Sequence, residues 1–383
     1  MSESENELAS LKLASTGGVD GGRVIIAGGG TGGHIFPAIA IANALKKNQP
    51  GIEILFVGAK GKMEMEKVPQ AGYKIEGLDI AGFNRSSLIK NIDLPIKLIR
   101  SFFQVRRIIN EFKPAAVIGV GGYSSFPVLR YAQAKRIPTF IHESNSFAGK
   151  ANIFLARNAT KIFVATEGME KFFPASKILI TGNPVRDSIV NSNVTRKQGI
   201  DFFGLDEAKK TVFVTGGSLG AKTINEAIDA GTSIIEKNNL QLIWQTGKLY
   251  AAKASEKAVE SKNIWANDFI SNMEYAFSAA DIVVSRSGAM SIAELCVVGK
   301  PVVFVPYPFA AEDHQTVNAQ HLVKRNAGIM VKDNEAKEKL VETVIALSKD
   351  EQRQKELKEN IKKLSVTNAD QIIAKEILRA IHG

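Results

Sequence analysis

The sequence contains very few of the residues that build disulfide frameworks or metal sites. Cys296 is the only cysteine among 383 residues, which excludes an internal disulfide and predicts a reducing, cytoplasmic setting. The five histidines do not pair with cysteine or carboxylates at the spacing of metal ligands, so no metal ion is expected.

Long apolar runs are also absent from the sequence. No stretch reaches the roughly 18 apolar residues that a membrane-spanning helix needs. The best candidate, 301–311, contains three prolines and predicts a strand that leads into a loop. Residues 1–20 lack the basic start and apolar core of a signal peptide, and their composition predicts a disordered tail. The remainder has a globular composition, with 45% hydrophobic residues and a length that suits two domains.

The net charge of +10 is unevenly distributed along the chain. Residues 1–190 carry 24 basic against 15 acidic side chains, whereas residues 191–383 carry 25 against 24. The excess is densest in 85–136, with ten basic and two acidic residues. This pattern predicts an anionic partner for the first half, either nucleic acid or an anionic membrane surface.

Short β-branched runs alternate with helix-length amphipathic stretches, which predicts parallel βαβ units and an α/β fold. The predicted strands are 23–27, 52–57, 116–120, 139–142 and 161–165, followed by 211–214, 241–245, 263–266, 282–285, 302–305 and 329–331. A polar stretch at 187–199 separates the two series, so the domain boundary is expected between 185 and 205. We therefore predict domains at 21–190 and 191–383, with a charged helical tail from Asn334.

Each half contains a strand, a glycine-rich loop and a helix in that order. The first loop, 28–33, has five glycines in six positions, and the second reads GGSLG at 216–220. Glycines let a backbone approach an anion closely, and the following helix offers free N–H groups. Two doubly wound domains facing each other would bring both loops beside one cleft.

The first loop formally satisfies the dinucleotide pattern G-x-G-x-x-G at Gly28, Gly30 and Gly33. A ribose-binding acid should end the next strand, but no acid follows it until Glu64, which argues against NAD. The sequence also lacks G-x-x-x-x-G-K-[ST], which argues against a Walker-type NTPase. The alternative is that these glycines serve only close packing of helix against strand.

Two further residues stand at predicted strand–helix junctions. His34 follows the first loop, and its position leaves a structural role and an acid/base or ligand-contact role open. The stretch 285–295, SRSGAMSIAEL, predicts a turn and a helix over 289–298 whose small amino-terminal residues suit a diphosphate. Glu294 lies among apolar neighbours and needs a polar partner, for which ribose hydroxyls are the candidate.

Eight motifs together resemble those of one enzyme family, in the same order. They are GGTGGHIFPAIAIA (29–42), GGYSSFP (121–127), HESNSFAGKAN (142–152), GNPVR (182–186), GGSLGAKTIN (216–225), DFI (268–270), SRSGAMSIAEL (285–295) and EDHQTVNA (312–319). The chain from about residue 23 onward resembles the MurG family, the UDP-N-acetylglucosamine:undecaprenyl-pyrophosphoryl-muramoyl-pentapeptide N-acetylglucosaminyltransferases of peptidoglycan synthesis. The resemblance implies the GT-B fold, in which two Rossmann-like domains with doubly wound parallel sheets flank a cleft. It places the donor on the C-terminal domain and the lipid acceptor on the N-terminal one, and it allows the last helix to pack back on the N-terminal domain.

The resemblance also implies roles for particular residues. The implied substrate-binding residues are Thr31, Gly32, Gly33, Asn145, Arg186, Ser218, Ile270, Ala289, Met290, Ser291, Ile292, Ala293, Glu294 and Gln315. The first loop would lie beside the sugar and diphosphate, Asn145 would contact the acetamido group, and Arg186 and Ser218 would contact the diphosphate. Ile270 would read uracil through its backbone, the segment 289–294 would hold the nucleotide with Glu294 on the ribose, and Gln315 would bind sugar hydroxyls. His314 stands where a common family form has a second glutamine, which leaves one sugar contact open.

The implied reaction is an inverting transfer, in which the C4 hydroxyl of muramic acid attacks C1 of the donor sugar and UDP leaves. His34 is the first candidate for the base that takes the hydroxyl proton, and Glu143 is the second. No D-x-D motif is present, so neither a bound divalent ion nor another cofactor is expected. The anion expected at the first glycine loop is the pyrophosphate of the lipid acceptor.

The basic segment 78–109 then has a candidate partner. It mixes apolar with basic side chains, namely Ile80, Phe83, Leu88, Ile89, Ile92 and Leu94 with Arg85, Lys90, Lys97, Arg100, Arg106 and Arg107. Such a surface suits peripheral docking on anionic lipid at the cytoplasmic face of the bacterial plasma membrane. The alternative is an ordinary crossover helix with a solvated basic face. Nucleic acid is not expected, because interleaved stacking aromatics and a known binding motif are missing.

Two other functions stay open on the sequence alone. One is a GT-B transferase that acts on a different acceptor. The other is a non-catalytic, nucleotide-sugar-binding scaffold at the membrane. Turnover with a muramoyl lipid acceptor distinguishes both from the implied reaction.

Overall fold

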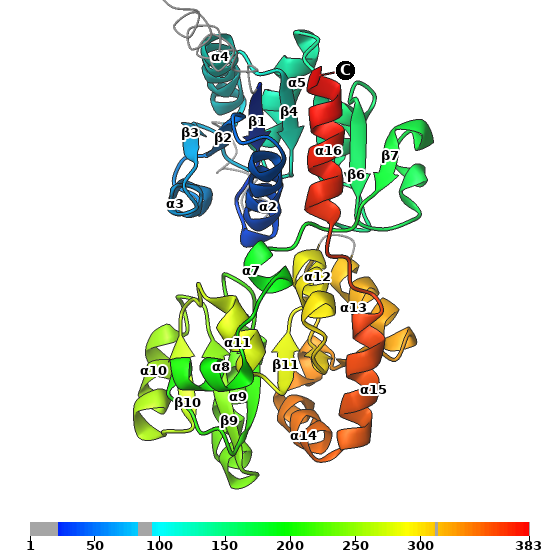
Figure 1. Cartoon of the computed structure of the whole chain (residues 1–383). Helices are drawn as coiled ribbons and strands as arrows, with labels where there is room; N and C mark the ends of the chain where they lie inside the picture. Colours follow the sequence, from blue (N-terminus) through cyan, green and yellow to red (C-terminus); the bar gives the residue numbers. More distant parts are fainter. Residues whose placement is uncertain (1–21, 83–93, 311–312, 383) are drawn as a thin grey trace, which may run out of the picture.

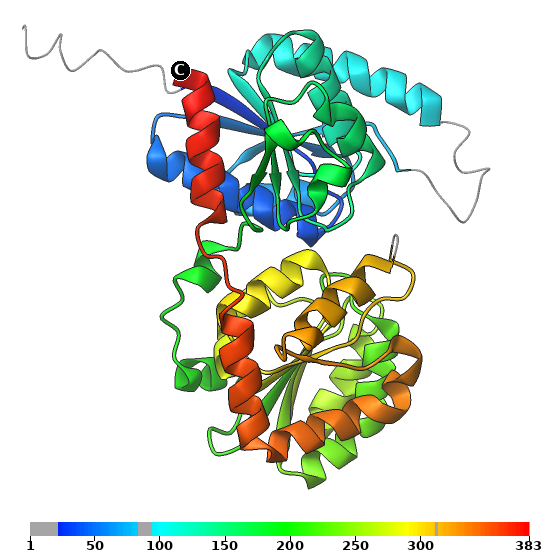
Figure 2. The same ribbon diagram turned by 90° about the vertical axis from the view of Figure 1, so that its right-hand side faces the viewer.

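The computed structural model describes residues 22–82, 94–310 and 313–382, which form two α/β domains stacked end to end (Figures 1 and 2). Each domain has a parallel sheet with helices on both faces. The predicted fold class of two doubly wound parallel-sheet domains is therefore confirmed.

The first domain contains, within the described residues, a seven-stranded parallel sheet in the order β3-β2-β1-β4-β5-β6-β7. Its strands are β1 (Arg23–Ala27), β2 (Glu53–Ala59), β3 (Lys74–Leu78), β4 (Ala116–Gly119), β5 (Thr139–Glu143), β6 (Lys161–Val164) and β7 (Ile178–Ile180). Its helices are α2 (Gly32–Asn48), α3 (Glu64–Gln70), α4 (Leu94–Phe112), α5 (Ser125–Ala134) and α6 (Lys150–Ala156), with short 3-10 turns at Met169–Lys171 and Ala175–Lys177. The central strands are apolar and almost fully buried because helices cover both faces of the sheet.

The second domain contains, in the part of the chain that the structure describes, a six-stranded parallel sheet in the order β10-β9-β8-β11-β12-β13. Its strands are β8 (Lys210–Thr215), β9 (Leu240–Gln245), β10 (Ile264–Asn267), β11 (Ile282–Ser285), β12 (Val302–Phe304) and β13 (Ile329–Met330). The helices from the crossing onward are α7 (Asp187–Val190), α8 (Arg196–Phe203), α9 (Lys222–Lys237), α10 (Ala251–Glu260), α11 (Met273–Ala279), α12 (Ala289–Val298), α13 (His314–Lys324), α14 (Ala336–Lys349), α15 (Glu351–Lys362) and α16 (Ala369–His382), with a 3-10 turn at Asp333–Glu335.

The strand order reverses direction at one point in each sheet. In the first domain β1 lies between β2 and β4, and in the second β8 lies between β9 and β11. Loops that leave such strand pairs diverge to opposite faces and open a crevice at the carboxyl ends of the strands. The glycine loops after β1 and β8 both start at this point, so the topology places them where ligands bind.

The two cores do not divide at residue 190. Val185 and Ile189 already pack in the core of the second domain. The chain then returns, since Ile373 and Ile377 of α16 are buried in the core of the first domain beside α2 (Figure 1). The C-terminal helix therefore covers the first domain, as the family resemblance allowed.

Two edge strands, β3 and β7, were not predicted from the sequence. β3 alternates half-buried and exposed residues and includes Gly77, and β7 has only three residues, so neither carries a run of buried β-branched residues. The predicted disordered tail at 1–20 lies outside the described residues. Several side chains of the predicted membrane segment also lie outside them, namely Phe83, Arg85, Leu88, Ile89, Lys90 and Ile92. Within the described ranges, no helix has the length and apolarity to cross a membrane.

Candidate active site

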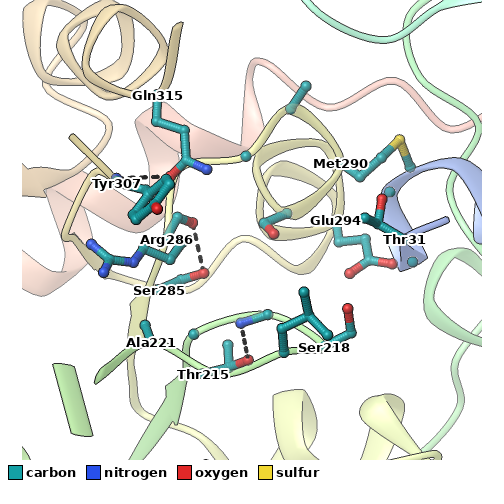
Figure 3. Close-up of a pocket in the computed structure, with 18 of the residues that line it drawn as sticks. Thr31, Thr215, Ser218, Ala221, Ser285, Arg286, Met290, Glu294, Tyr307 and Gln315 are labelled. Carbon is teal, nitrogen blue, oxygen red and sulfur yellow. Dashed lines mark hydrogen bonds between the residues drawn. The ribbon is translucent and has the colours of Figure 1, made fainter. Parts of the chain in front are cut away.

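A cavity of about 860 Å³ opens between the domains at the two reversal points (Figure 3). It collects most of the residues that the family resemblance implied. Of the residues singled out from the sequence, those on its wall are Thr31, Gly32, Gly33, His34 and Asn145 from the first domain, Arg186 from the crossing, and Ser218, Ile270, Ala289, Met290, Ser291, Glu294, His314 and Gln315 from the second. The two glycine loops face each other here, because a Cβ on Gly32 would lie 3.6 Å from Oγ of Ser218.

The first glycine loop uses its early N–H groups inside the protein. Gly28 donates to the carbonyl of Val57 at 3.1 Å and Gly29 to that of Gly121 at 3.2 Å. Gly30 donates to a carboxylate oxygen of Glu64 at 2.7 Å. The groups left for a ligand are those of Thr31, Gly32 and Gly33 at the amino end of α2, which narrows the expected anion contact to the second half of the loop.

His34 lies in the first turn of α2, with its ring on the cavity wall. Its Nδ1 lies 3.0 Å from the carbonyl oxygen of Gly29. A carbonyl oxygen only accepts, so this geometry assigns a proton to Nδ1, and whenever the ring is neutral the lone pair is on Nε2. Nε2 lies beside Gly121, where an added Cβ would come within 2.7 Å of it. The geometry suits the predicted role of His34 as a base.

Glu143, the second candidate base, is 5% exposed and is not among the residues on the cavity wall. Its two oxygens accept hydrogen bonds from the backbone and side chain of Asn145, the backbone of Gly149 and the side chain of Asn152. These bonds tie down the loop that presents Asn145 to the cavity. The structure therefore favours a role for Glu143 in holding this loop over a role in proton abstraction.

The neighbouring His142 was not singled out from the sequence. It is buried in β5, and this burial, together with the repulsion that a protonated His34 would exert, lowers the pKa of His142 to about 4. His142 is therefore neutral near pH 7 and does not compete with His34 for the proton. Its position at the end of a predicted buried strand was the available sequence signal.

Glu294 and Arg186 form an ion pair across the cavity wall. The guanidinium donates from Nε to Oε1 of Glu294 at 2.9 Å, and both side chains are mostly buried. The same guanidinium lies 4.4 Å from the ring centroid of Phe36 in α2. Arg186 thus links the two domains, and Glu294 has the polar partner that a glutamate among apolar residues requires.

The other second-domain residues lie around α12, whose amino end points at the cavity. Ile270 donates its N–H to Oε1 of buried Gln245 at 2.9 Å, so this N–H is already used inside the protein. The N–H of Tyr307 donates to Oε1 of Gln315 at 3.0 Å, as Figure 3 shows. Ile292 and Ala293 are not among the wall residues and instead pack against the core of the second domain.

Three charged residues of the cavity wall, Lys222, Arg286 and Asp333, were missed from the sequence. Lys222 is the first residue of α9, directly after the second glycine loop, and its side chain is 83% exposed. A lysine at this point is a signal for anion binding that could have been used. Buried Arg286 pairs with Asp333 at 2.5 Å, and this contact between distant segments has no local sequence signature.

Comparison with known proteins decides the family. The glycosyltransferase family 28 N-terminal domain matches residues 24–164, and the family 28 C-terminal domain matches residues 211–373. The chain belongs to glycosyltransferase family 28. The resemblance to the MurG family is confirmed by its curated relatives, which are named UDP-N-acetylglucosamine–N-acetylmuramyl-(pentapeptide) pyrophosphoryl-undecaprenol N-acetylglucosamine transferase. The relative from Phocaeicola vulgatus is 50% identical over 93% of this chain and 96% of its own. The relative from Parabacteroides distasonis is 50% identical over 94% of this chain and 98% of its own.

Solved structures support the architecture of this glycosyltransferase. The crystal structure of Acinetobacter baumannii MurG superposes with a TM-score of 0.71 at 28% identity, over 94% of this chain and 99% of that one. The S. aureus MnaA–UDP co-structure has a TM-score of 0.67 at 15% identity, over 93% and 96%, and shows the fold alone. The expected GT-B arrangement is thereby confirmed.

Proposed function

We propose that this glycosyltransferase moves N-acetylglucosamine from UDP-N-acetylglucosamine to the C4 hydroxyl of muramoyl-pentapeptide on undecaprenyl pyrophosphate, with inversion at C1. The observation that carries the proposal is the cavity between the domains. It combines a glycine loop with a histidine from one domain and a second glycine loop with Glu294 from the other. The relatives with 50% identity carry the name of this reaction.

The second domain supplies the groups suited to the nucleotide. The amino end of α12, with Ala289, Met290 and Ser291, offers free N–H groups and the positive end of a helix dipole to a diphosphate. Glu294 would accept from the ribose hydroxyls and Arg186 would meet the diphosphate. These two side chains pair with each other, so both polar heads lie together at the point where the ribose and the diphosphate would meet them.

The first domain supplies the proton acceptor. The C4 hydroxyl attacks C1, its proton passes to Nε2 of His34, and the bond from C1 to the diphosphate oxygen breaks with its electrons on UDP. Negative charge develops on the diphosphate, so the α12 amino end and Arg186 stabilise the transition state more than the ground state. The carbohydrate centre carries oxocarbenium character, which Asn145 and Gln315 would help to orient through the sugar.

Helix α4 of the first domain offers a surface for the lipid. Ile96, Ile99 and Phe103 are 56%, 58% and 66% exposed. Lys97, Arg100 and Arg106 lie on the same helix. Each basic residue near an anionic bilayer contributes about 1 kcal/mol of binding, and the exposed apolar side chains would enter the interface. We infer peripheral binding at the cytoplasmic face of the bacterial plasma membrane, where the polyprenyl acceptor lies.

Single-turnover transfer tests the proposal directly. The purified chain is mixed with UDP-N-acetylglucosamine and vesicles that contain undecaprenyl-pyrophosphoryl-muramoyl-pentapeptide, and the disaccharide lipid is quantified. We expect transfer to this lipid to exceed hydrolysis of the donor and transfer to soluble or other glycolipid acceptors by orders of magnitude. Transfer no faster than hydrolysis would refute it, and donor binding without turnover would favour the non-catalytic scaffold.

A further inference from the structure

One peptide group of the first glycine loop is hydrogen-bonded at both ends. The N–H of Gly30 donates to Oε2 of Glu64 at 2.7 Å. The carbonyl of Gly29, which belongs to the same peptide unit, faces Nδ1 of His34 at 3.0 Å. We infer that Glu64, acting through the Gly29–Gly30 peptide, is a positioning residue that fixes the tautomer and basicity of His34. This inference rests on the proposed function only in assigning His34 as the base.

Glu64 is held as a built feature of the loop. Its side chain is 1% exposed, and its other oxygen, Oε1, accepts the N–H of Ala59 at 2.9 Å. Two glycines make room for it, since a Cβ on Gly29 would lie 2.3 Å from its carboxyl carbon and a Cβ on Gly58 would lie 2.5 Å from its Cγ. Gly29 also has a φ of +148°, which side-chain-bearing residues rarely adopt. The first glycine loop, strand β2 and the carboxylate of Glu64 therefore depend on one another for their positions.

The chain of hydrogen bonds has a defined chemical effect. A carboxylate that accepts from a peptide N–H draws electron density toward the carbonyl oxygen of that peptide, and linked hydrogen bonds strengthen one another at low dielectric. The carbonyl of Gly29 then accepts more strongly from Nδ1–H of His34. That bond keeps the proton on Nδ1, leaves the lone pair on Nε2 and stabilises the imidazolium that forms when Nε2 takes the hydroxyl proton. A buried carboxylate that bonds directly to histidine has the same effect in hydrolases, and here a peptide group lies between the two.

The arrangement also explains why the first loop failed as a dinucleotide fingerprint. The first acid after β2 is Glu64, which lies at the start of α3 beyond the end of that strand and is turned under the loop, where its Oε2 accepts from the N–H of Gly30. The early part of this loop thus has an internal anion. Its task is to hold His34 rather than to receive a phosphate.

The first test reads the ring of His34 without any assay of transfer. The full chain is labelled with ¹⁵N-histidine, and the signal of His34 among the five histidines is assigned by its loss in the His34→Gln variant. At about pH 8, where an ordinary histidine is neutral, we expect the protonated nitrogen to be Nδ1, against the usual preference of free histidine for Nε2–H. A ring protonated on Nε2 in the unaltered protein would overturn the inference, whether or not the protein transfers sugar.

The second test removes the charge of Glu64. Glu64→Gln should shift the His34 signal toward a mixture of tautomers, because the side-chain amide no longer polarises the peptide. It should lower kcat by about 10- to 100-fold while the donor KM changes by less than about twofold. Glu66→Gln is the matched control, since Glu66 lies on the same helix with its side chain 63% exposed, and it should leave the tautomer and kcat unchanged.

The variant also separates positioning from folding. Melting temperature and donor affinity show whether the Glu64→Gln protein is folded. If the folded variant loses kcat while the tautomer of His34 stays unchanged, the inference is overturned. It is also overturned if neither kcat nor the tautomer changes. If the variant does not fold, a His34 ring protonated on Nε2 in the unaltered protein would still overturn the inference. If the unaltered protein transfers no sugar but its His34 is protonated on Nδ1, the proposed function is refuted and the inferred role of Glu64 stands.

Discussion

The two glycine loops share the same strand–loop–helix motif and differ in what lies beneath them. Under the first loop, the buried carboxylate of Glu64 accepts from Gly30. Under the second, the atoms nearest to added Cβ positions on Gly216 and Gly220 are backbone atoms and Ala221. His34 directly follows the first loop, and Lys222 lies two positions after the second. One motif is thus followed by the histidine that we propose as the proton acceptor, and the other by a lysine that we propose to attract the diphosphate.

The domains that carry these loops differ as well. The first domain has the basic excess, the exposed apolar side chains of α4 and the histidine, which suit a lipid-linked nucleophile. The second has a nearly balanced charge and the α12 amino end with Glu294, which suit a nucleotide. If the two domains bind different substrates, substitutions in the first domain should mainly change kcat, and substitutions in the second should mainly change the donor KM.

The largest expected effect comes from His34 in the first loop. His34→Gln should lower kcat by about 10³-fold, because loss of a general base typically costs 10²–10⁴-fold, while donor affinity stays within about twofold. Steady-state kinetics and donor titration measure the two quantities. The control is His321→Gln on the exposed side of α13. A loss of donor affinity as large as the loss of kcat would erase the distinction between the loops.

Glu294 in the second domain should behave in the opposite way. Glu294→Ala removes a hydrogen-bonded carboxylate, worth about 1.5–3 kcal/mol, and leaves Arg186 unpaired, so the donor KM should rise about 50-fold. The acceptor KM should stay within about twofold. Glu338→Ala, at an exposed position of α14, provides the control. Equal effects on both KM values would contradict the ribose role.

Much of this division could be predicted from the sequence. Arg23–Ala27 and Ile282–Ser285 were predicted to the residue, because central strands of a parallel sheet are short, apolar and bounded by glycine or polar turns. The helix Ala289–Val298 was also predicted correctly, since Gly288 precedes it and Gly299, with a φ of +66°, ends it. Local signals of this kind position both loops.

The remaining features depend on contacts between distant segments. Glu64 is only another acid in a charged stretch until the fold turns it under Gly30. Glu143 and His34 are both polar residues near strand ends, and only the four hydrogen bonds of Glu143 distinguish a loop anchor from a base. The pairing of Arg186 with Glu294 joins residues 108 positions apart. No periodicity or motif spacing encodes such pairs.

The membrane surface provides a weaker difference between the domains. Ile99→Ser and Phe103→Ser each remove an exposed apolar side chain from α4, and each should lower binding to anionic vesicles about tenfold. Vesicle flotation with anionic and neutral lipids measures this. Val259→Ser, 89% exposed in the second domain, should have no effect. Binding that ignores lipid charge would count against the docking surface.

The smallest predicted effect tests the second loop itself. Lys222→Ala should raise the donor KM about fivefold at low salt, because an exposed cation at a helix amino end attracts the diphosphate but is well solvated. Lys237→Ala, at the exposed far end of α9, should leave the KM unchanged. The effect of Lys222→Ala should shrink as ionic strength rises, since screening acts on exposed charges. The effect of Glu64→Gln should persist at the same salt, because that carboxylate is 1% exposed and its hydrogen bonds are inside the protein. Equal salt dependence of the two variants would mean that the two loops handle charge in the same way.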